Sequence, residues 1–257
     1  MDWMKRARDA GMKYLVVTSK HHEGFAMYKS KVSSFNIVDA TPFGRDVIGE
    51  LAEACRKHGI KLGLYYSQDL DWSDPDGGGY TEGKTWCNGK GYWTNNWDFP
   101  DTASKNFTRY FENKALPQVE EIVTQYGDIC LIWFDCPYTI SQEQSRQLYN
   151  LVRKHQPGAL INSRIGNNMG DYKSAGDNVI PETDRGGMLY ESPATLNDTW
   201  GYKYFDDNWK SAEKVIAIKR HLKSIGANYL LNVGPDHLGR IPGPAIDILR
   251  AVGKADN

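Results

Sequence analysis

Short runs rich in β-branched and aromatic residues alternate with amphipathic helical patterns along most of the chain. Strands are expected over residues 14–18, 60–67, 129–134, 159–163 and 229–233. Helices are expected over residues 45–58, 119–126, 142–155, 212–224 and 245–252, with a shorter helical pattern that ends at Ala10 and Gly11. This alternation is typical of a parallel sheet with crossover helices.

The run from Ile129 to Phe134 is almost continuously apolar, as expected for a strand that is buried on both faces of a parallel sheet. Long polar loops are expected over residues 68–100 and 166–191, and loops of this length in a compact domain are usually functional or mobile. The chain has 257 residues, a length that suits one closed α/β barrel. The pattern therefore predicts an α/β fold of the (β/α)8 type, a TIM-like barrel, in a single domain over residues 1–257.

The composition argues against several classes of function. The formal net charge is −1, so the chain lacks the positive field that holds nucleic acid. No apolar run reaches the roughly 18 residues that span a membrane, and the first residues lack the apolar stretch of a signal peptide. The four cysteines show no CxxC pairing, so we expect neither a metal site nor a disulfide scaffold, with Cys130 and Cys136 in the core. No cofactor is expected.

Polar residues recur where the expected strands end. Barrel active sites form at this edge because the loops that follow all strands meet there. We therefore expect one site at the edge, formed by His21, His22, Tyr65, Ser67, Asp135 and Arg164. A loop cluster of aromatic residues could present faces to sugars or pack beneath a long loop; its members are Trp86, Tyr92, Trp93 and Trp97.

Two carboxylates indicate sugar hydrolysis. Asp135 ends an apolar strand, where a partly desolvated charge needs either a catalytic role or a structural partner, such as a helix N-terminus or a cation. Glu191 opens a segment that contains aromatic residues. Retaining hydrolysis requires two carboxyl groups about 5–5.5 Å apart, one to attack and one to protonate the leaving oxygen. The competing acids are Glu182, Asp177 and Glu23.

The adjacent histidines His21 and His22 are expected to point to opposite sides of an extended backbone, so they would not share one metal ion. A hydrogen-bonding role is the better interpretation, and at least one of the two is expected to be structural. Arg164 either holds a substrate oxygen or a carboxylate, or forms a structural ion pair.

Several motifs occur in an order that resembles the α-L-fucosidases of glycoside hydrolase family 29. They run over almost the whole chain, which is why the resemblance is specific although each motif alone is weak. In chain order they are Ala10–Tyr14 (AGMKY), Lys20–Phe25 (KHHEGF), Gly63–Ser67 (GLYYS), Trp133–Asp135 (WFD), Asn162–Arg164 (NSR), Tyr190–Tyr202 (YESPATLNDTWGY) and Asn228–Pro235 (NYLLNVGP).

The resemblance implies a retaining exo-glycosidase that removes terminal α-L-fucosyl residues from a fucosylated oligosaccharide or glycoconjugate through a covalent intermediate. The aspartate of the WFD motif, here Asp135, corresponds to the nucleophile. Glu191 corresponds to the acid/base, on a loop whose length varies in the family. The residues that correspond to the fucose pocket are His21, His22, Tyr65, Trp133, Arg164 and Trp200.

The sequence also departs from the family. Relatives usually carry a first strand with a His-Trp-Gly motif, a following Glu-Trp-Tyr-like motif and often a C-terminal β-sandwich, and these are not in the chain. A barrel incomplete at its N-terminus and poor activity are therefore expected. The alternatives are an α-galactosidase-like enzyme, since L-fucose and D-galactose share much of their hydroxyl geometry, or an impaired sugar-binding fragment. Relatives are secreted, periplasmic or lysosomal, and the sequence indicates neither compartment nor oligomeric state.

Overall fold

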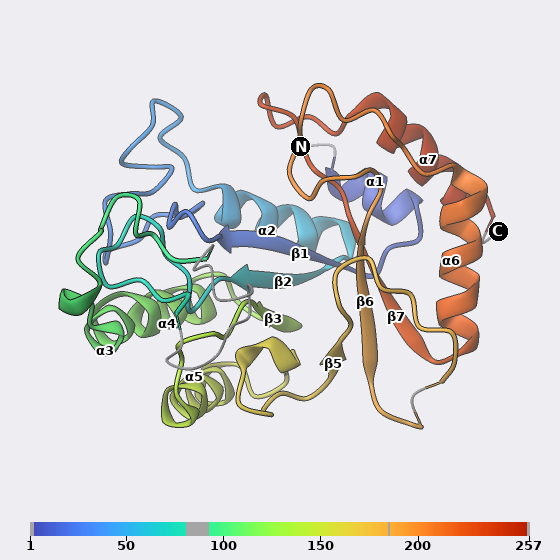
Figure 1. Cartoon of the computed structure of the whole chain (residues 1–257). Coiled ribbons are helices and arrows are strands. Elements are labelled where there is room, and N and C mark those ends of the chain that lie inside the picture. The colour runs from blue at the N-terminus through green and yellow to red at the C-terminus, as the bar shows by residue number, and fades with distance from the viewer. Residues whose placement is uncertain (1–2, 81–92, 185, 256–257) are drawn as a thin grey trace. The chain divides into compact units, whose positions relative to one another are not determined.

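The computed structural model describes residues 3–80, 93–184 and 186–255. The chain forms two compact units, each with its own sheet. The β1–β4 unit comprises Tyr14–Arg56 and Lys61–Asp171, and the β5–β7 unit comprises Met1–Lys13, Lys57–Ile60 and Tyr172–Asn257. The elements of both are labelled in Figure 1.

The β1–β4 unit is built on four parallel strands in sequential order. They are β1 (Tyr14–Lys20), β2 (Lys61–Tyr66), β3 (Leu131–Phe134) and β4 (Leu160–Ile161). In the register, Gly63 of β2 lies between Val16 and Leu131. A Cβ at Gly63 would lie 2.9 Å from the Leu131 side chain, so glycine allows the close approach of the neighbouring side chain. Because all four strands run in one direction, their carboxyl ends share one edge of the sheet.

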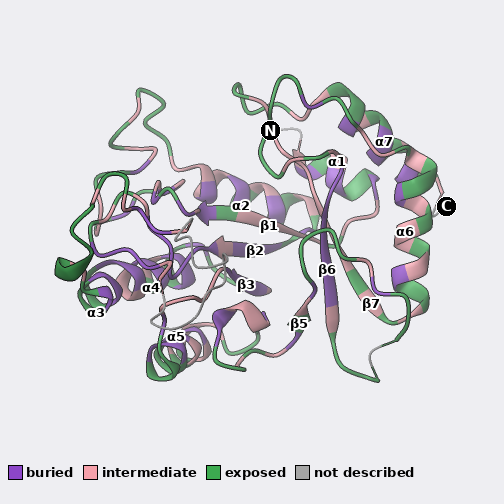
Figure 2. Cartoon of the chain, in the orientation of Figure 1, coloured by how far each residue is buried: buried purple, intermediate pink, exposed green. Residues whose placement is uncertain are grey.

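Three longer helices connect these strands. They are α2 (Val47–His58), α4 (Leu116–Gln125) and α5 (Gln142–His155). Helix α2 buries Ile48, Leu51 and Cys55 on one face, and Figure 2 shows buried and exposed residues alternating along it. Short helical segments are η1 (Thr102–Ser104), α3 (Phe107–Tyr110), the π-helical η2 (Phe111–Ala115) before α4, and η3 (Ser163–Ile165) after β4.

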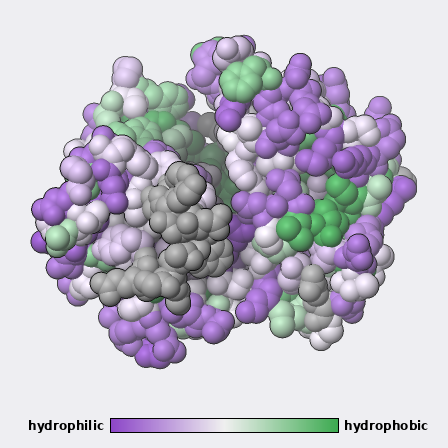
Figure 3. All heavy atoms as spheres, viewed as in Figure 1, coloured by the Kyte–Doolittle hydropathy of each residue, from purple (hydrophilic) through white to green (hydrophobic). Residues whose placement is uncertain are grey.

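The β5–β7 unit contains three parallel strands, β5 (Lys173–Ser174), β6 (Tyr190–Thr195) and β7 (Ala227–Asn232), with β6 in the centre. Its helices are α1 (Trp3–Asp9), α6 (Ala212–Ser224) and α7 (Gly243–Lys254). An apolar core joins α6 and α7 to the chain after β6; its buried members are Leu196, Val215, Ala245, Ile248 and Val252. Figure 3 shows that hydrophobic side chains on the viewed surface gather in patches between hydrophilic regions.

The structure confirms the predicted α/β class, with parallel sheets. The helices expected over 142–155 and 212–224 are α5 and α6 with the predicted bounds. The other expected helices and strands are present with shifted ends; the strand expected over 159–163 ends already at Ile161. Among the described residues, no helix is both long and apolar enough to cross a membrane.

The prediction of a loop over residues 166–191 was wrong in part, because this segment contains β5 and the start of β6. Strand β6 was not predicted because it contains a proline and polar residues. The Pro193 carbonyl accepts a hydrogen bond from the Asn178 N–H, on the side of β5, where strand pairing has ended after Glu191. The N–H that proline lacks would point to the same side, so Pro193 costs no ladder hydrogen bond.

The cysteines differ from the prediction too. Cys130 and Cys136 were expected in the core but are only partly buried, because Cys130 precedes β3 and Cys136 lies two residues after its end. Cys55 on α2 is buried instead, and these three are free thiols. Cys87, with Trp86 and Tyr92 of the aromatic cluster, lies outside the described residues.

Candidate active site

The carboxyl edge of the β1–β4 sheet collects the residues that the sequence singled out in this unit. His21 and His22 follow β1, Tyr65 lies in β2, and Asp135 directly follows β3. Arg164 lies in η3, after β4. The parallel register brings Tyr65 beside Trp133, so residues far apart in sequence meet at one edge.

Asp135 is the centre of this cluster. Its side chain is 12% exposed, and each oxygen accepts hydrogen bonds. Oδ2 accepts from the Tyr65 hydroxyl at 2.9 Å, and Oδ1 accepts from Arg164 Nη1 at 2.9 Å and from its neighbour's backbone, the Cys136 N–H, at 3.0 Å. The cation and these donors compensate the buried charge. A carboxylate held in this way keeps one orientation, as a nucleophile requires.

Aromatic rings form the wall beside this carboxylate. Tyr65 stacks on Trp133 at 5.5 Å between ring centroids and on His21 at 5.4 Å. The Arg164 guanidinium lies 4.6 Å from the centroid of the Trp133 ring, a cation–π contact that fixes its plane. Burial, together with the negative charge of Asp135, raises the pKa of Tyr65 well above its usual value, so the phenol stays protonated and donates to Asp135.

His22 is buried and held as a neutral imidazole. Ser67 donates its hydroxyl hydrogen to the Leu70 carbonyl, so the 2.8 Å contact between His22 Nδ1 and Ser67 Oγ is a donation from the imidazole. Nε2 then carries a lone pair. Burial above all, with smaller effects from His21 and Lys20, lowers the pKa of His22 to about 2. Nε2 lies 3.8 Å from Asp135 Oδ2, so a substrate hydroxyl could donate to this nitrogen beside the carboxylate.

The prediction that His21 and His22 point to opposite sides was wrong. Their ring centroids are 3.9 Å apart. Strand β1 ends at Lys20, and the Gly24 N–H donates to the His21 carbonyl to close a turn, so the backbone is not extended here. Gly24 has φ +87°, and a Cβ there would lie 2.2 Å from Asp71 Oδ1. Only glycine fits this turn.

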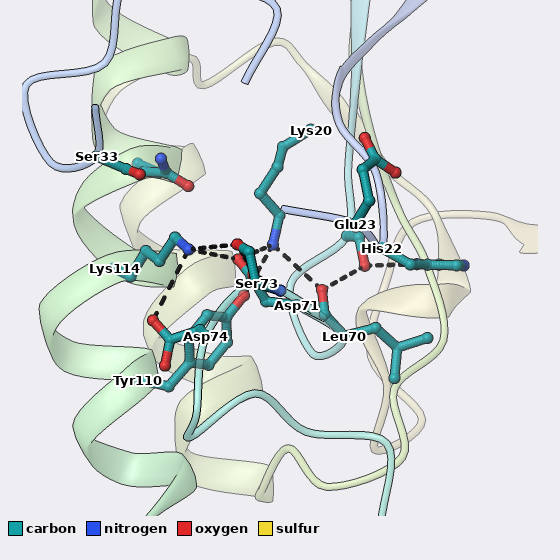
Figure 4. A network of polar contacts seen from close by, with 12 residues as sticks. Lys20, His22, Glu23, Ser33, Leu70, Asp71, Ser73, Asp74, Tyr110 and Lys114 are labelled. Atoms are coloured by element: carbon teal, nitrogen blue, oxygen red, sulfur yellow. Dashed lines mark hydrogen bonds and ion pairs between the residues drawn. The ribbon is translucent and has the colours of Figure 1, made fainter. Parts of the chain in front are cut away.

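A buried ionic network anchors the same turn (Figure 4). Lys20 is fully buried and donates to Asp71 Oδ2 at 3.0 Å, to the Tyr110 hydroxyl at 2.9 Å and to a backbone carbonyl. Lys114, in the π-helical η2, lies 2.9 Å from the same Asp71 oxygen. Desolvation lowers the pKa of Lys20, although Asp71 opposes this. The Trp72 N–H donates to the His22 carbonyl at 2.7 Å, so this network holds the histidine turn against the loop after β2.

His22, Asp135 and Cys136 offer ligand atoms that all lie within 4.8 Å of one another. The donor set nevertheless fits a metal ion poorly. Asp135 already pairs with the Arg164 cation, and burial raises the pKa of the Cys136 thiol far above its usual value, which opposes the thiolate that a metal binds. We assign the cluster to hydrogen bonding.

In the β5–β7 unit, Glu191 is only 2% exposed. The sequence placed it on a loop, but it lies in the central strand β6, opposite Asn228 of β7. Asn228 Nδ2 donates to Glu191 Oε2 at 3.1 Å, and the Tyr172 hydroxyl lies 3.5 Å from Oε1. Sequence reasoning assigned no role to Tyr172 or Asn228; recognising β6 would have placed Asn228 beside Glu191.

The remaining candidates of this unit are more exposed. Glu182 and Asp177, the competing acids, are both exposed, whereas Glu191 is buried and held by side chains. Trp200 is 39% exposed, and its backbone carbonyl accepts from Asn232 Nδ2 at 2.8 Å.

Two members of the aromatic cluster are described in the β1–β4 unit. The Trp93 ring packs edge-on against His22 with ring centroids 6.1 Å apart, and the Trp97 ring packs edge-on against Trp72 with ring centroids 5.6 Å apart. Glu23, the third competing acid, is exposed and lies 3.4 Å from His21 Nδ1.

Comparisons with known proteins agree on one family. The family model described as Alpha-L-fucosidase matches residues 1–255. Tissue alpha-L-fucosidase from Bos taurus is 33% identical over 98% of this chain, and Alpha-L-fucosidase from Dictyostelium discoideum is 29% identical over the same share. The chain spans about half the length of these curated relatives, 52% of each.

Solved structures are similar as well. Alpha-L-fucosidase AlfC from Lactobacillus casei, in complex with its α-L-fucose product, is 53% identical with a TM-score of 0.92, covering 99% of this chain and 78% of that one. A variant of AlfC was solved with Fuca(1,6)GlcNAc. Alpha-L-fucosidase from Vibrio sp. strain EJY3 is 38% identical with a TM-score of 0.89, covering 99% of this chain and 43% of that one.

Proposed function

The chain belongs to the α-L-fucosidase family, and we propose that it hydrolyses terminal α-L-fucosyl residues of fucosylated glycans with retention of configuration. The observation that carries the proposal is Asp135. It is a buried carboxylate at the carboxyl edge of a parallel sheet, oriented by Tyr65 and Arg164 and flanked by the neutral His22. The complexes of AlfC with fucose and with a fucosylated sugar support the same substrate class.

The reaction has two steps. In the first, Asp135 attacks the anomeric carbon, the bond from that carbon to the leaving oxygen breaks, and the Glu191 carboxylic acid gives its proton to that oxygen. In the second, the Glu191 carboxylate takes a proton from water, which attacks the anomeric carbon and releases Asp135 and fucose. We assign Tyr65 and Arg164 to orient the nucleophile. His21, His22, Trp133 and Trp200 are assigned to the sugar pocket.

We also propose that the two parallel sheets belong to a single (β/α)8-type catalytic domain. Parallel strands joined by helices, with functional residues at their carboxyl ends, are the pattern of that barrel. The close likeness to α-L-fucosidase structures over 99% of the chain supports it.

The assignment of Asp135 is tested by replacing it with glycine. Turnover of 4-nitrophenyl α-L-fucoside should be lost, because the variant lacks the carboxylate assigned to form the covalent intermediate. Added azide should restore part of the rate by entering the space left by the carboxylate and forming a carbon–nitrogen bond, giving a β-fucosyl azide. A variant that keeps most of its activity without azide would overturn the assignment.

A further inference from the structure

Gln68 contacts the backbone of both partners of the ion pair at the candidate active site. It lies two residues after β2, and its side chain is fully buried. Its Oε1 accepts a hydrogen bond from the Asp135 N–H at 2.9 Å, and its Nε2 donates to the Arg164 carbonyl at 2.9 Å. One amide group therefore spans the two residues whose side chains meet at 2.9 Å.

Both strand ladders of β3 end before Asp135. The ladder between β2 and β3 ends at Tyr66 and Phe134. The ladder between β3 and β4 has two residue pairs and ends at Ile132 and Ile161. The Asn162 side chain continues it, because its Oδ1 accepts from the Phe134 N–H and its Nδ2 donates to the Phe134 carbonyl, both at 2.9 Å. The next N–H along the chain is that of Asp135, and Gln68 accepts from it. Two side-chain amides thus continue the contacts of β3 beyond the ends of both ladders, Asn162 at Phe134 and Gln68 at Asp135.

The backbone beyond this N–H is in an unfavourable conformation. Cys136 has φ +50°, in the left-handed region that costs energy for a residue with a Cβ. Such a conformation persists only where neighbouring contacts hold it. Gln68 holds the peptide between Phe134 and Asp135, one residue before the strained Cys136.

We propose that Gln68 is a positioning residue, which sets how the Asp135 carboxylate and the Arg164 guanidinium face each other and thereby aims the nucleophile. The inference rests on the proposed function, because it assigns Asp135 the attacking role. Gln68 touches the backbone rather than reacting atoms. Its loss should therefore lower the rate of attack more than the binding of the sugar.

The chain provides a matched control in Gln156. Its amide also bridges backbone groups of the β1–β4 unit, with Nε2 donating to the Val123 and Gly127 carbonyls and Oε1 accepting from the Ile129 N–H. These bonds lie before the start of β3, whereas those of Gln68 lie after its end. Replacing either glutamine with methionine keeps the length of the side chain and removes its hydrogen bonds.

The test compares Gln68→Met and Gln156→Met in the full chain. For Gln68→Met we expect kcat on 4-nitrophenyl α-L-fucoside, per folded molecule, to fall about 10- to 100-fold, because misplacement of a reacting group by about 1 Å costs this order of rate. The inhibition constant of fucose should change by less than about threefold, since ground-state contacts remain. Gln156→Met should lose stability while kcat stays close to that of the wild type. Equal kcat in the two variants would overturn the inference.

Amide hydrogen exchange tests the inference without turnover. The Asp135 N–H should be protected in the wild type and in Gln156→Met, and should exchange faster in Gln68→Met. Rapid exchange of this amide in the wild type, or unchanged protection in Gln68→Met, would show that Gln68 does not hold the nucleophile. A wild-type chain without fucosidase activity would refute the proposed function but not the role of Gln68. If Gln68→Met fails to fold, the exchange rate of the Asp135 N–H in the wild type tests the role of Gln68.

Discussion

At the scale of single residues, the two carboxyl groups assigned to catalysis have different surroundings. Asp135 has a cation and a phenol as partners, whereas Glu191 has an amide and a phenol. The Arg164 cation compensates the negative charge of Asp135, and the contacts with Asn228 and Tyr172 fix the position of the Glu191 side chain.

Replacing Glu191 with alanine tests its role as the acid. We expect a large loss on Fuca(1,6)GlcNAc, whose leaving oxygen needs a proton, and a much smaller loss on 4-nitrophenyl fucoside, whose leaving group needs little protonation. The exposed Glu182 supplies the control, because Glu182→Ala should retain both activities. Equal losses on the two substrates in Glu191→Ala would contradict the assignment.

The neutral His22 makes stability depend on pH. In the unfolded chain this histidine binds a proton below about pH 6.5, whereas in the folded chain its pKa is lowered to about 2. Between these values the unfolded state binds more protons, so stability is lost as pH falls, by up to about 1.4 kcal/mol per pH unit. Urea unfolding of wild type and His22→Gln at several pH values between about 7.5 and 4.5 should show a shallower decline in the variant.

The exposed His237 provides the control for this experiment. His237→Gln should keep the acid sensitivity of the wild type. Buried carboxylates such as Asp71 contribute acid sensitivity equally to all three chains, so the difference between slopes isolates His22. A His22→Gln slope equal to that of the wild type would show that the folded histidine is charged.

At the scale of elements, the sequence predicts what local pattern determines. Helix α5 has its predicted bounds because Ser141 and Gln144 form a capping box at its start, a signal that a sequence carries. Strand β6 and the turn at His21 were not predicted, because partners distant in sequence stabilise them. Glu191 pairs with Ser174 and Asn228, and the turn fits against Asp71.

The packing of α1 against α7 gives a prediction at this scale. A Cβ at Gly253 of α7 would lie 2.1 Å from the Asp9 carbonyl oxygen, which is backbone and cannot rotate away. Gly253→Ala should therefore lower the free energy of unfolding by about 1–3 kcal/mol, as overpacking does. Gly243 begins the same helix with nothing within 4 Å of its Cβ position. Gly243→Ala should leave stability unchanged or raise it by up to about 1 kcal/mol.

Thermal or urea unfolding of these two glycine variants provides the measurement. A Gly253→Ala chain as stable as Gly243→Ala would mean that the two helices do not pack as closely as the structure shows.

At the scale of the whole molecule, the sequence predicts which side chains cluster, and the structure shows which hydrogen bonds hold them. The polar residues after the expected strands predicted a cluster at one edge of the sheet, and the structure places His21, His22, Tyr65 and Arg164 close to Asp135 or to one another. The hydrogen bonds of Gln68 and Asn162 could not be predicted, because they depend on where the β2–β3 and β3–β4 ladders end. Residue types led to the proposed chemistry, and the three-dimensional contacts show how the side chains are oriented.

The stereochemical outcome belongs to this scale, because Asp135 and Glu191 lie in different sheets and retention depends on both. If each residue acts as assigned, two successive inversions at the anomeric carbon give α-L-fucose as the first product, which then mutarotates. Proton NMR during hydrolysis of 4-nitrophenyl α-L-fucoside should show the α-anomer first, and the matching α-D-galactoside should react more slowly. A β-anomer that appears first would show that water attacks directly, so that Asp135 would serve as a base rather than as a nucleophile. Faster hydrolysis of the galactoside would instead leave the two-step mechanism intact and show that the pocket prefers D-galactose to L-fucose.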